Sequence, residues 1–150
     1  MIRDAIKSAQ IGAMKAGDKE RLAAVRLILA KLKDRDIELR TADTKPDDDA
    51  LAVDVLQKMA KQRRESIAMY EQGGREELAA KEQAELDVIE EFLPRQLGEE
   101  ETRAAIEAIK AEIGATSLKD MGKLMAALKE RHGTVLDMSK ASGLVKAALA

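Results

Sequence analysis

Apolar residues recur every three or four positions along most of the chain, a spacing that predicts amphipathic α-helices rather than strands. The first helix is expected from Ile2 to about Met14, and Gly17 marks its end. Asp18 is placed to cap a second helix, whose apolar stripe is made of large aliphatic side chains. The stripe consists of Leu22, Val25, Leu29, Leu32 and Leu39.

Polar residues and glycines delimit a third helix. Residues 41–46 read as a loop, and Asp47 or Asp48 after it can cap the helix, helped by acidic charge near its N-terminus. The apolar spacing then continues to about Gln72. The pair Gly73-Gly74 ends the helix and leaves room only for a short turn.

The same signals predict a fourth helix and then a second domain. The fourth helix is expected from Glu76 to Leu93, folded back against the third helix, and Pro94 stops it. We place the boundary at residues 94–98, which gives domains over residues 1–94 and 95–150. Shorter helices are expected over residues 99–113, 117–130 and 137–149. The predicted fold is all-α, with an N-terminal bundle of about four helices followed by a smaller three-helix domain.

The composition supports helices and removes several kinds of chemistry. Charged residues make up 36% of the 150 positions, while Tyr70 and Phe92 are the only aromatic side chains. The core must therefore be aliphatic, and the scarcity of strand-forming residues argues against a sheet. No cysteine is present, so disulfides and thiolate chemistry are excluded. With His132 as the only histidine, we expect neither a metal site nor a bound cofactor.

No apolar run approaches the about 20 residues that a membrane span requires. The N-terminal sequence Met1-Ile2-Arg3-Asp4 lacks the apolar region of a secretory signal. We therefore expect a cytoplasmic protein that does not enter a membrane.

Charge is unevenly distributed along the chain. The net charge is −2, so the chain as a whole is not a basic nucleic-acid binder. Residues 118–150 nevertheless contain six Lys or Arg against three Asp or Glu, whereas residues 76–91 contain seven acids and one Lys. Candidate phosphate contacts in the basic segment are Lys119, Lys123, Lys129 and Arg131. The alternative is that these are ordinary solubilising side chains.

The helix expected from Ser117 has two ends of interest. Ser117 can cap its start, and the free backbone N–H groups there can bind an anion. At the far end, His132 next to Gly133 is placed to interact favourably with the helix dipole. A catalytic role for His132 would require an orienting partner and a nucleophile, and the nearby serines alone do not form a triad.

Two charged residues fall in the middle of apolar helix faces. Arg63 lies on the apolar face of the third helix, and Glu82 on that of the fourth. An isolated charge on a buried face is costly, so these groups should be paired.

Folding the hairpin puts Arg63 level with residues 82–85. We predict a buried pair between Arg63 and Glu82, with Glu85 as the alternative partner. The pair would fix helix register, and the other interpretation is that Arg63 binds a ligand carboxylate or phosphate.

The third helix also carries a basic patch. Lys58, Lys61 and Arg64 point away from the apolar stripe. They form either a solvated face neutralised by the acidic fourth helix or a phosphate-binding surface.

Motifs in both predicted domains resemble the GatB/YqeY-like family. The resemblance rests on helical segments together with the turns between them, and it covers essentially the whole chain. The segments are Leu22–Leu27 (LAAVRL), Lys61–Ile67 (KQRRESI), Gly74-Arg75, Lys81–Glu85 (KEQAE), Phe92–Leu97 (FLPRQL) and Gly114–Met125 (GATSLKDMGKLM).

The C-terminal part is similar to the helical tail of the GatB protein, a component of the glutamine-dependent aspartyl/glutamyl-tRNA amidotransferase. That resemblance implies an RNA contact within residues 117–146, which adds Lys140 and Lys146 to the candidate residues. It implies a tRNA- or translation-associated binding module, with tRNA and a translation or amidotransferase protein as expected partners and no DNA. The turn Gly133–Asp137 departs from the family's Gly-Arg-Ala-Asp-like pattern because it lacks the arginine.

Two other functions remain alternatives. The family is associated with carbon–nitrogen ligase activity that uses glutamine as amido-N-donor, so the chain could be an enzyme or an accessory subunit in amidation of aminoacyl-tRNA. It lacks a Ser-Ser-Lys amidase constellation and the large domain that houses the reaction, so we expect no catalysis by the chain alone. The third alternative is a protein-interaction adaptor.

Overall fold

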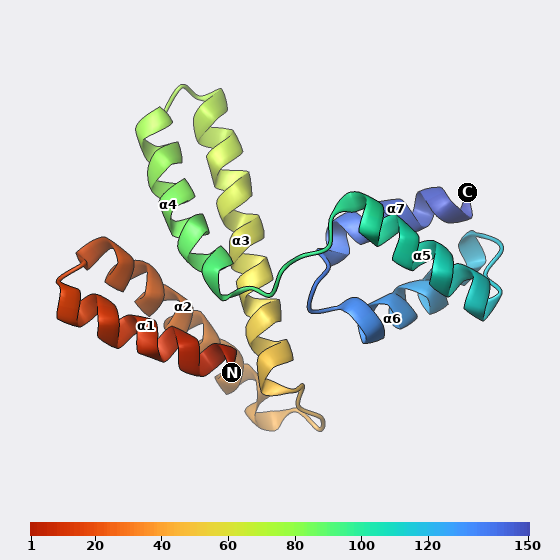
Figure 1. The fold of residues 1–150 in the computed structure, drawn as a ribbon, viewed down its shortest axis with the longest axis horizontal. Coiled ribbons are helices and arrows are strands. Elements are labelled where there is room, and N and C mark those ends of the chain that lie inside the picture. Colours follow the sequence, from red (N-terminus) through yellow and green to blue (C-terminus); the bar gives the residue numbers. More distant parts are fainter. The chain divides into compact units, whose positions relative to one another are not determined.

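The computed structural model describes residues 1–150, which form α-helices and short 3-10 turns but no strand (Figure 1). The chain divides into two compact units, Met1–Leu93 and Pro94–Ala150. None of the helices is long and apolar enough to cross a membrane. The first unit holds α1 (Ile2–Ala16), α2 (Lys19–Glu38), α3 (Asp48–Gln72) and α4 (Glu76–Phe92); the second holds α5 (Glu99–Ile113), α6 (Met121–His132) and α7 (Met138–Leu149). The predicted all-α fold is confirmed.

The N-terminal unit consists of two helical hairpins whose turns have a clear origin in the sequence. Gly17 ends α1 with φ of 69°, and the Asp18 carboxylate accepts a hydrogen bond from the Arg21 amide at 3.1 Å to cap α2. Gly74, with φ of 70°, closes the α3–α4 hairpin. The amide of Arg75 there donates back to the carbonyl of Tyr70 at 2.8 Å, as in a Schellman motif.

The core of this unit gathers around the first half of α3. Every buried residue of α3 lies between Leu51 and Ala60, and the last three turns of the helix contain none. On α4, Ala79 is the only buried residue before Leu86. We call residues 61–82 the distal arm, because this end of the hairpin extends away from α1 and α2 (Figure 1). The largest fully buried side chains of the unit are Ile6, Val25, Ile28, Leu32, Val53, Leu56 and Ile89.

The C-terminal unit packs three helices around a second aliphatic core. Leu124 and Leu128 of α6 are fully buried against residues of α5 and α7. The connecting segment is held by a hydrogen bond from the amide of Leu97 to the carbonyl of Val135 at 2.8 Å. The helix expected from Ser117 instead begins with a 3-10 turn, Leu118–Asp120, and becomes α-helical at α6.

A second difference concerns the end of α2. The α-helix stops at Glu38, and a 3-10 turn over Leu39–Thr41 follows, where the sequence predicted that the apolar stripe would continue to Leu39. The side chain of Leu39 still packs against the core, so the apolar periodicity outlasts the regular helix.

We expect Leu56→Ala to lower the free energy of unfolding by about 2–5 kcal/mol, because Leu56 is fully buried and its removal leaves a cavity. Urea unfolding followed by helical circular dichroism measures the change. Leu27→Ala is the matched control: Leu27 is 36% exposed, and the same substitution there should cost less than about 1 kcal/mol. Equal losses in the two variants would contradict the assignment of the core.

Candidate nucleic-acid interface

Charge in the C-terminal unit is segregated by helix. The α5 sequence contains five glutamates against Arg103 and Lys110. The α7 sequence contains Lys140 and Lys146 and no acid. The segment from Lys119 through α6 also carries more basic than acidic residues. Positive charge is therefore concentrated on two of the three helices.

The lysines of the α6 segment occupy its solvent-facing side. At about 100° per residue, Lys123 and Lys129 fall on the two flanks of α6 that point away from the buried Leu124 and Leu128, and Lys119 precedes α6 in the 3-10 turn. All three lysines are exposed, and none forms an ion pair. Their neighbours include the small residues Gly122 and Ala126 and two acids, Glu130 and Asp120, the second of which interacts with the charge of Lys123.

The α7 helix has a similar exposed face. Lys140 and Lys146 are exposed and form no ion pair, while Val145 lies on the buried side. Gly143 and Ala147 lie with the lysines on the exposed side. The helix is capped as predicted, since the Asp137 carboxylate accepts a hydrogen bond from the amide of Ser139 at 3.0 Å.

Arg131 differs from these lysines because a carboxylate neutralises it. Its Nη2 lies 2.7 Å from Oε1 of Glu112 on α5, and its Nη1 also bonds that carboxylate. The hydrogen bonds lower the pKa of Glu112 and raise the pKa of Arg131. Arg131 thus links α5 to α6 and offers less free positive charge than the lysines.

The start of the α6 segment carries its own anion. Oδ2 of Asp120 accepts hydrogen bonds from the amides of Thr116 at 3.0 Å and Ser117 at 3.3 Å. These hydrogen bonds, helped by the charge of Lys123, lower the pKa of Asp120. A carboxylate therefore already lies beside the amides that precede the 3-10 turn, and the anion-binding role expected for the helix start stays a prediction. The Ser-x-x-Asp spacing of Ser117 and Asp120 is the sequence signal that could have predicted this carboxylate beside the backbone amides.

His132 is the last residue of α6, and its carbonyl accepts a hydrogen bond from the amide of Val135 at 3.0 Å. The residue therefore lies at a helix C-terminus, where a positive charge is favourable. No group of three or more His, Asp or Glu side chains is arranged to hold a metal ion.

In the N-terminal unit, Arg63 lies at the α3–α4 interface against two acids. Its Nε is 2.9 Å from Oε2 of Glu85 and 3.3 Å from Oε2 of Glu82. Only 17% of the Arg63 side chain is exposed. Neither contact has hydrogen-bond geometry, and Nε of Arg63 and Oε2 of Glu82 are both buried without a hydrogen-bond partner. Both acids considered from the sequence thus surround Arg63, and Glu85 is the nearer.

The basic patch of α3 is partly neutralised. Nζ of Lys58 lies 3.1 Å from Asp54, one turn earlier on the same helix. Nη2 of Arg64 lies 3.1 Å from Oε1 of Glu90 on α4. Lys61 is exposed. The arrangement resembles a solvated, charge-balanced helix face more than a free phosphate-binding surface.

Two cations with structural roles were missed from the sequence. Arg3 bonds Asp36 of α2 and Asp48 of α3, and these carboxylates raise its pKa. Lys110 donates from Nζ to the carbonyl of Ala148 at 2.8 Å, near the C-terminus of α7. No local spacing connects residues so far apart in sequence, so only the tertiary fold could identify these contacts.

The family model described as a Yqey-like protein matches residues 3–149 of the chain. The Altered inheritance of mitochondria protein 41, mitochondrial, of Eremothecium gossypii is 36% identical over 81 residues, which are 54% of this chain and 43% of that protein. The protein of the same name from Saccharomyces cerevisiae is 33% identical over 81 residues, 42% of its length. The chain spans less than half the length of these curated relatives.

We expect Arg63 to couple more strongly to Glu85 than to Glu82. In double-mutant cycles with Arg63→Ala, Glu85→Gln should show a coupling energy of about 1 kcal/mol or more, because its contact is the shorter one. Glu82→Gln should show less, since its Oε2 lies 3.3 Å from Nε of Arg63, farther than that of Glu85. Urea unfolding of the single and double variants supplies the four free energies. Zero coupling in both cycles would reject an interhelical ion pair.

The stability of the folded chain should depend on pH through Asp120. Its pKa is lower in the folded state than in the unfolded chain, so its stabilising contribution is present above about pH 4 and is lost as the pH falls through that value and below. We expect Asp120→Asn to lower the melting temperature at about pH 6 and to have little effect at about pH 2. Glu107 of α5 is exposed and forms no ion pair, so Glu107→Gln is the control that should leave the melting temperature unchanged at both pH values. A difference between wild type and Asp120→Asn that persists unchanged at acid pH would contradict the proposed cause.

Proposed function

Because the chain belongs to the YqeY-like protein family, we propose that it is a tRNA- or translation-associated binding module whose C-terminal unit contacts RNA phosphates through α6 and α7. The observation that carries the proposal is the set of five exposed lysines without ion pairs on these two helices and the turn that leads into α6. They are Lys119, Lys123, Lys129, Lys140 and Lys146.

The chemistry of these residues suits a phosphate backbone. Lysine is a compact point charge with several donors, and contacts with phosphate oxygens require no rigid fork geometry. The small residues Gly122 and Gly143 lie among the lysines on the exposed faces, so a bulky backbone meets few obstructing side chains there. Arg131 is left out of the proposed contacts, since Glu112 already binds it.

The absence of exposed aromatic residues limits the kind of recognition. Sequence-specific binding of single-stranded RNA relies largely on bases stacked against aromatic side chains. The C-terminal unit has no aromatic residue at all, because Tyr70 and Phe92 belong to the other unit. The proposal is therefore recognition of the backbone and shape of a structured RNA, for which the resemblance to the amidotransferase tail favours tRNA.

The location of the protein belongs to the same proposal. A cytoplasmic site suits a tRNA-binding module, and the curated relatives from Eremothecium gossypii and Saccharomyces cerevisiae carry the word mitochondrial in their names. The cytoplasm and the mitochondrion both contain tRNA, so the binding test does not depend on which of them holds the protein.

The test is binding of purified tRNA to the full chain, measured by fluorescence anisotropy at several salt concentrations. With three to five phosphate contacts, the logarithm of the association constant should fall with log salt with a slope of about −2 to −4. We expect the triple variant Lys119→Glu, Lys123→Glu, Lys129→Glu to abolish binding, because three attractive contacts become repulsive.

The matched control changes three exposed lysines of the N-terminal unit, Lys7→Glu, Lys19→Glu and Lys33→Glu, which alters the net charge by the same amount. This control should retain binding to within a few-fold. Salt-independent binding, no binding, or equal loss in the two triple variants would reject the proposed surface.

A further inference from the structure

The distal arm has an incompletely covered apolar seam. When two helices pair only with each other, each buries one apolar stripe against its partner. Other elements of the fold normally cover the apolar side chains beside that stripe. In the distal arm, Ala79 is the only buried residue, and Ile67 is half-buried, with part of its side chain packed against the core of the unit. The exposed part of Ile67 and the exposed Ala80 are thus apolar surface of the arm that the rest of its own unit does not cover.

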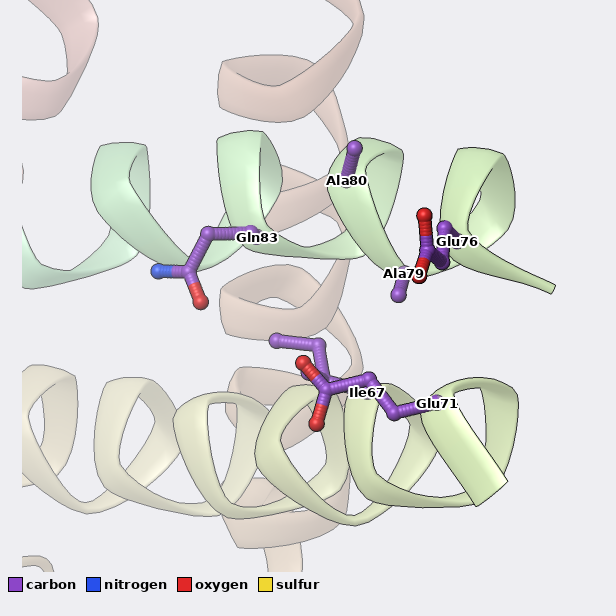
Figure 2. Close-up of a pocket in the computed structure, with 6 residues that line it drawn as sticks. All are labelled: Ile67, Glu71, Glu76, Ala79, Ala80 and Gln83. Carbon is purple, nitrogen blue, oxygen red and sulfur yellow. The ribbon is translucent and has the colours of Figure 1, made fainter. Parts of the chain in front are cut away.

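One side of this seam is hollowed into a groove of about 540 Å³, within the usual size range of pockets that hold organic ligands. Figure 2 shows the side chains of Ile67 from α3 and Gln83 from α4 extending into the space between the two helices. The apolar part of the groove comes from Ile67, Ala79 and Ala80. Its polar rim consists of Glu71, Glu76 and Gln83.

The charge of the rim indicates the occupant. Glu71 and Glu76 are exposed carboxylates, and neither forms an ion pair. Of the other acids of α4, four lie in ion pairs with arginines, namely Glu82, Glu85, Glu90 and Glu91. The acids without an ion pair at this end of the hairpin are Glu71, Glu76 and Glu77. Such a surface repels nucleic-acid phosphates and attracts lysine or arginine side chains.

An apolar seam beside unpaired carboxylates matches an amphipathic helix with a basic polar face. A large aliphatic side chain of such a helix can enter the groove at Ile67 and Ala79, while flanking basic side chains reach Glu71 and Glu76. The geometry points to this groove as a docking site for a basic amphipathic helix of a partner protein. This site is separate from the proposed RNA contacts, and its test does not depend on them.

The experiment uses the full chain and a fluorescein-labelled synthetic peptide of leucine and lysine, about 18 residues long, with all leucines on one helical face. We expect saturable binding in fluorescence anisotropy. Gln83→Arg should weaken it at least about tenfold, because the new side chain fills the groove and adds repulsion. The double variant Glu71→Gln, Glu76→Gln should weaken it about three- to tenfold, as expected for two rim charges.

Gln62→Arg is the matched control, because Gln62 is also an exposed glutamine of the hairpin but does not line the groove. This variant should bind within about twofold of wild type. Both arginine variants are made at exposed helix positions, so the helical circular dichroism should be unchanged.

Three outcomes would overturn the proposal. The first is no saturable binding of the peptide. The second is equal binding of a scrambled peptide that has no apolar face, or equal loss in Gln83→Arg and Gln62→Arg, because attraction would then come from the general acidity of α4. The third is self-association of the chain that Gln83→Arg abolishes in sedimentation velocity, because the occupant would then be a second copy.

Discussion

The N-terminal unit depends on the burial of one short stretch of α3. Between Leu51 and Ala60, this helix contributes apolar side chains to a core that also takes residues from α1, α2 and α4. No large aromatic residue is buried in that core, so many small aliphatic contacts must supply the packing energy. The helix, however, is 25 residues long, and the core covers less than half of it. The uncovered remainder belongs to the distal arm.

Beyond this core, ion pairs join the two helices of the hairpin where apolar contacts join them in the core. Along the hairpin beyond Ala60, α3 and α4 are joined by ion pairs of Arg63 and Arg64 with acids of α4. Partly exposed ion pairs stabilise less than a buried aliphatic contact, but they depend strongly on helix register. The arm therefore combines a defined geometry with apolar surface that no helix of its unit covers, and this combination is what a docking surface requires.

Local features of the fold could be predicted from the sequence, because their causes lie within a few residues. Asp18 and Asp137 cap helices by bonding amides two or three positions later, and Gly17 and Gly114 adopt the left-handed conformation that ends a helix. The level of Arg63 against residues 82–85 follows from hairpin geometry, once the turn at Gly74 is fixed.

Contacts between distant residues could not be predicted in this way. The bond of Arg131 to Glu112 joins positions 19 residues apart, and that of Arg3 to Asp48 joins positions 45 apart. In the C-terminal unit this changes the functional interpretation, because Arg131 is a structural cation while the neighbouring lysines stay free. A count of basic residues treats these groups alike, and only their partners in the fold distinguish them.

The same reasoning explains why the net charge of −2 says little about binding. At physiological ionic strength a charge acts over about 8 Å, so a partner senses the local surface and not the sum over the chain. At the distal end of the hairpin Glu71, Glu76 and Glu77 are exposed without an ion pair, and on α7 two lysines meet no acid. The two proposals therefore assign a polyanion and a basic helix to different surfaces of opposite charge. In general, opposite local charges allow a nearly neutral protein to discriminate between two kinds of partner, because a surface that attracts one charge repels the other.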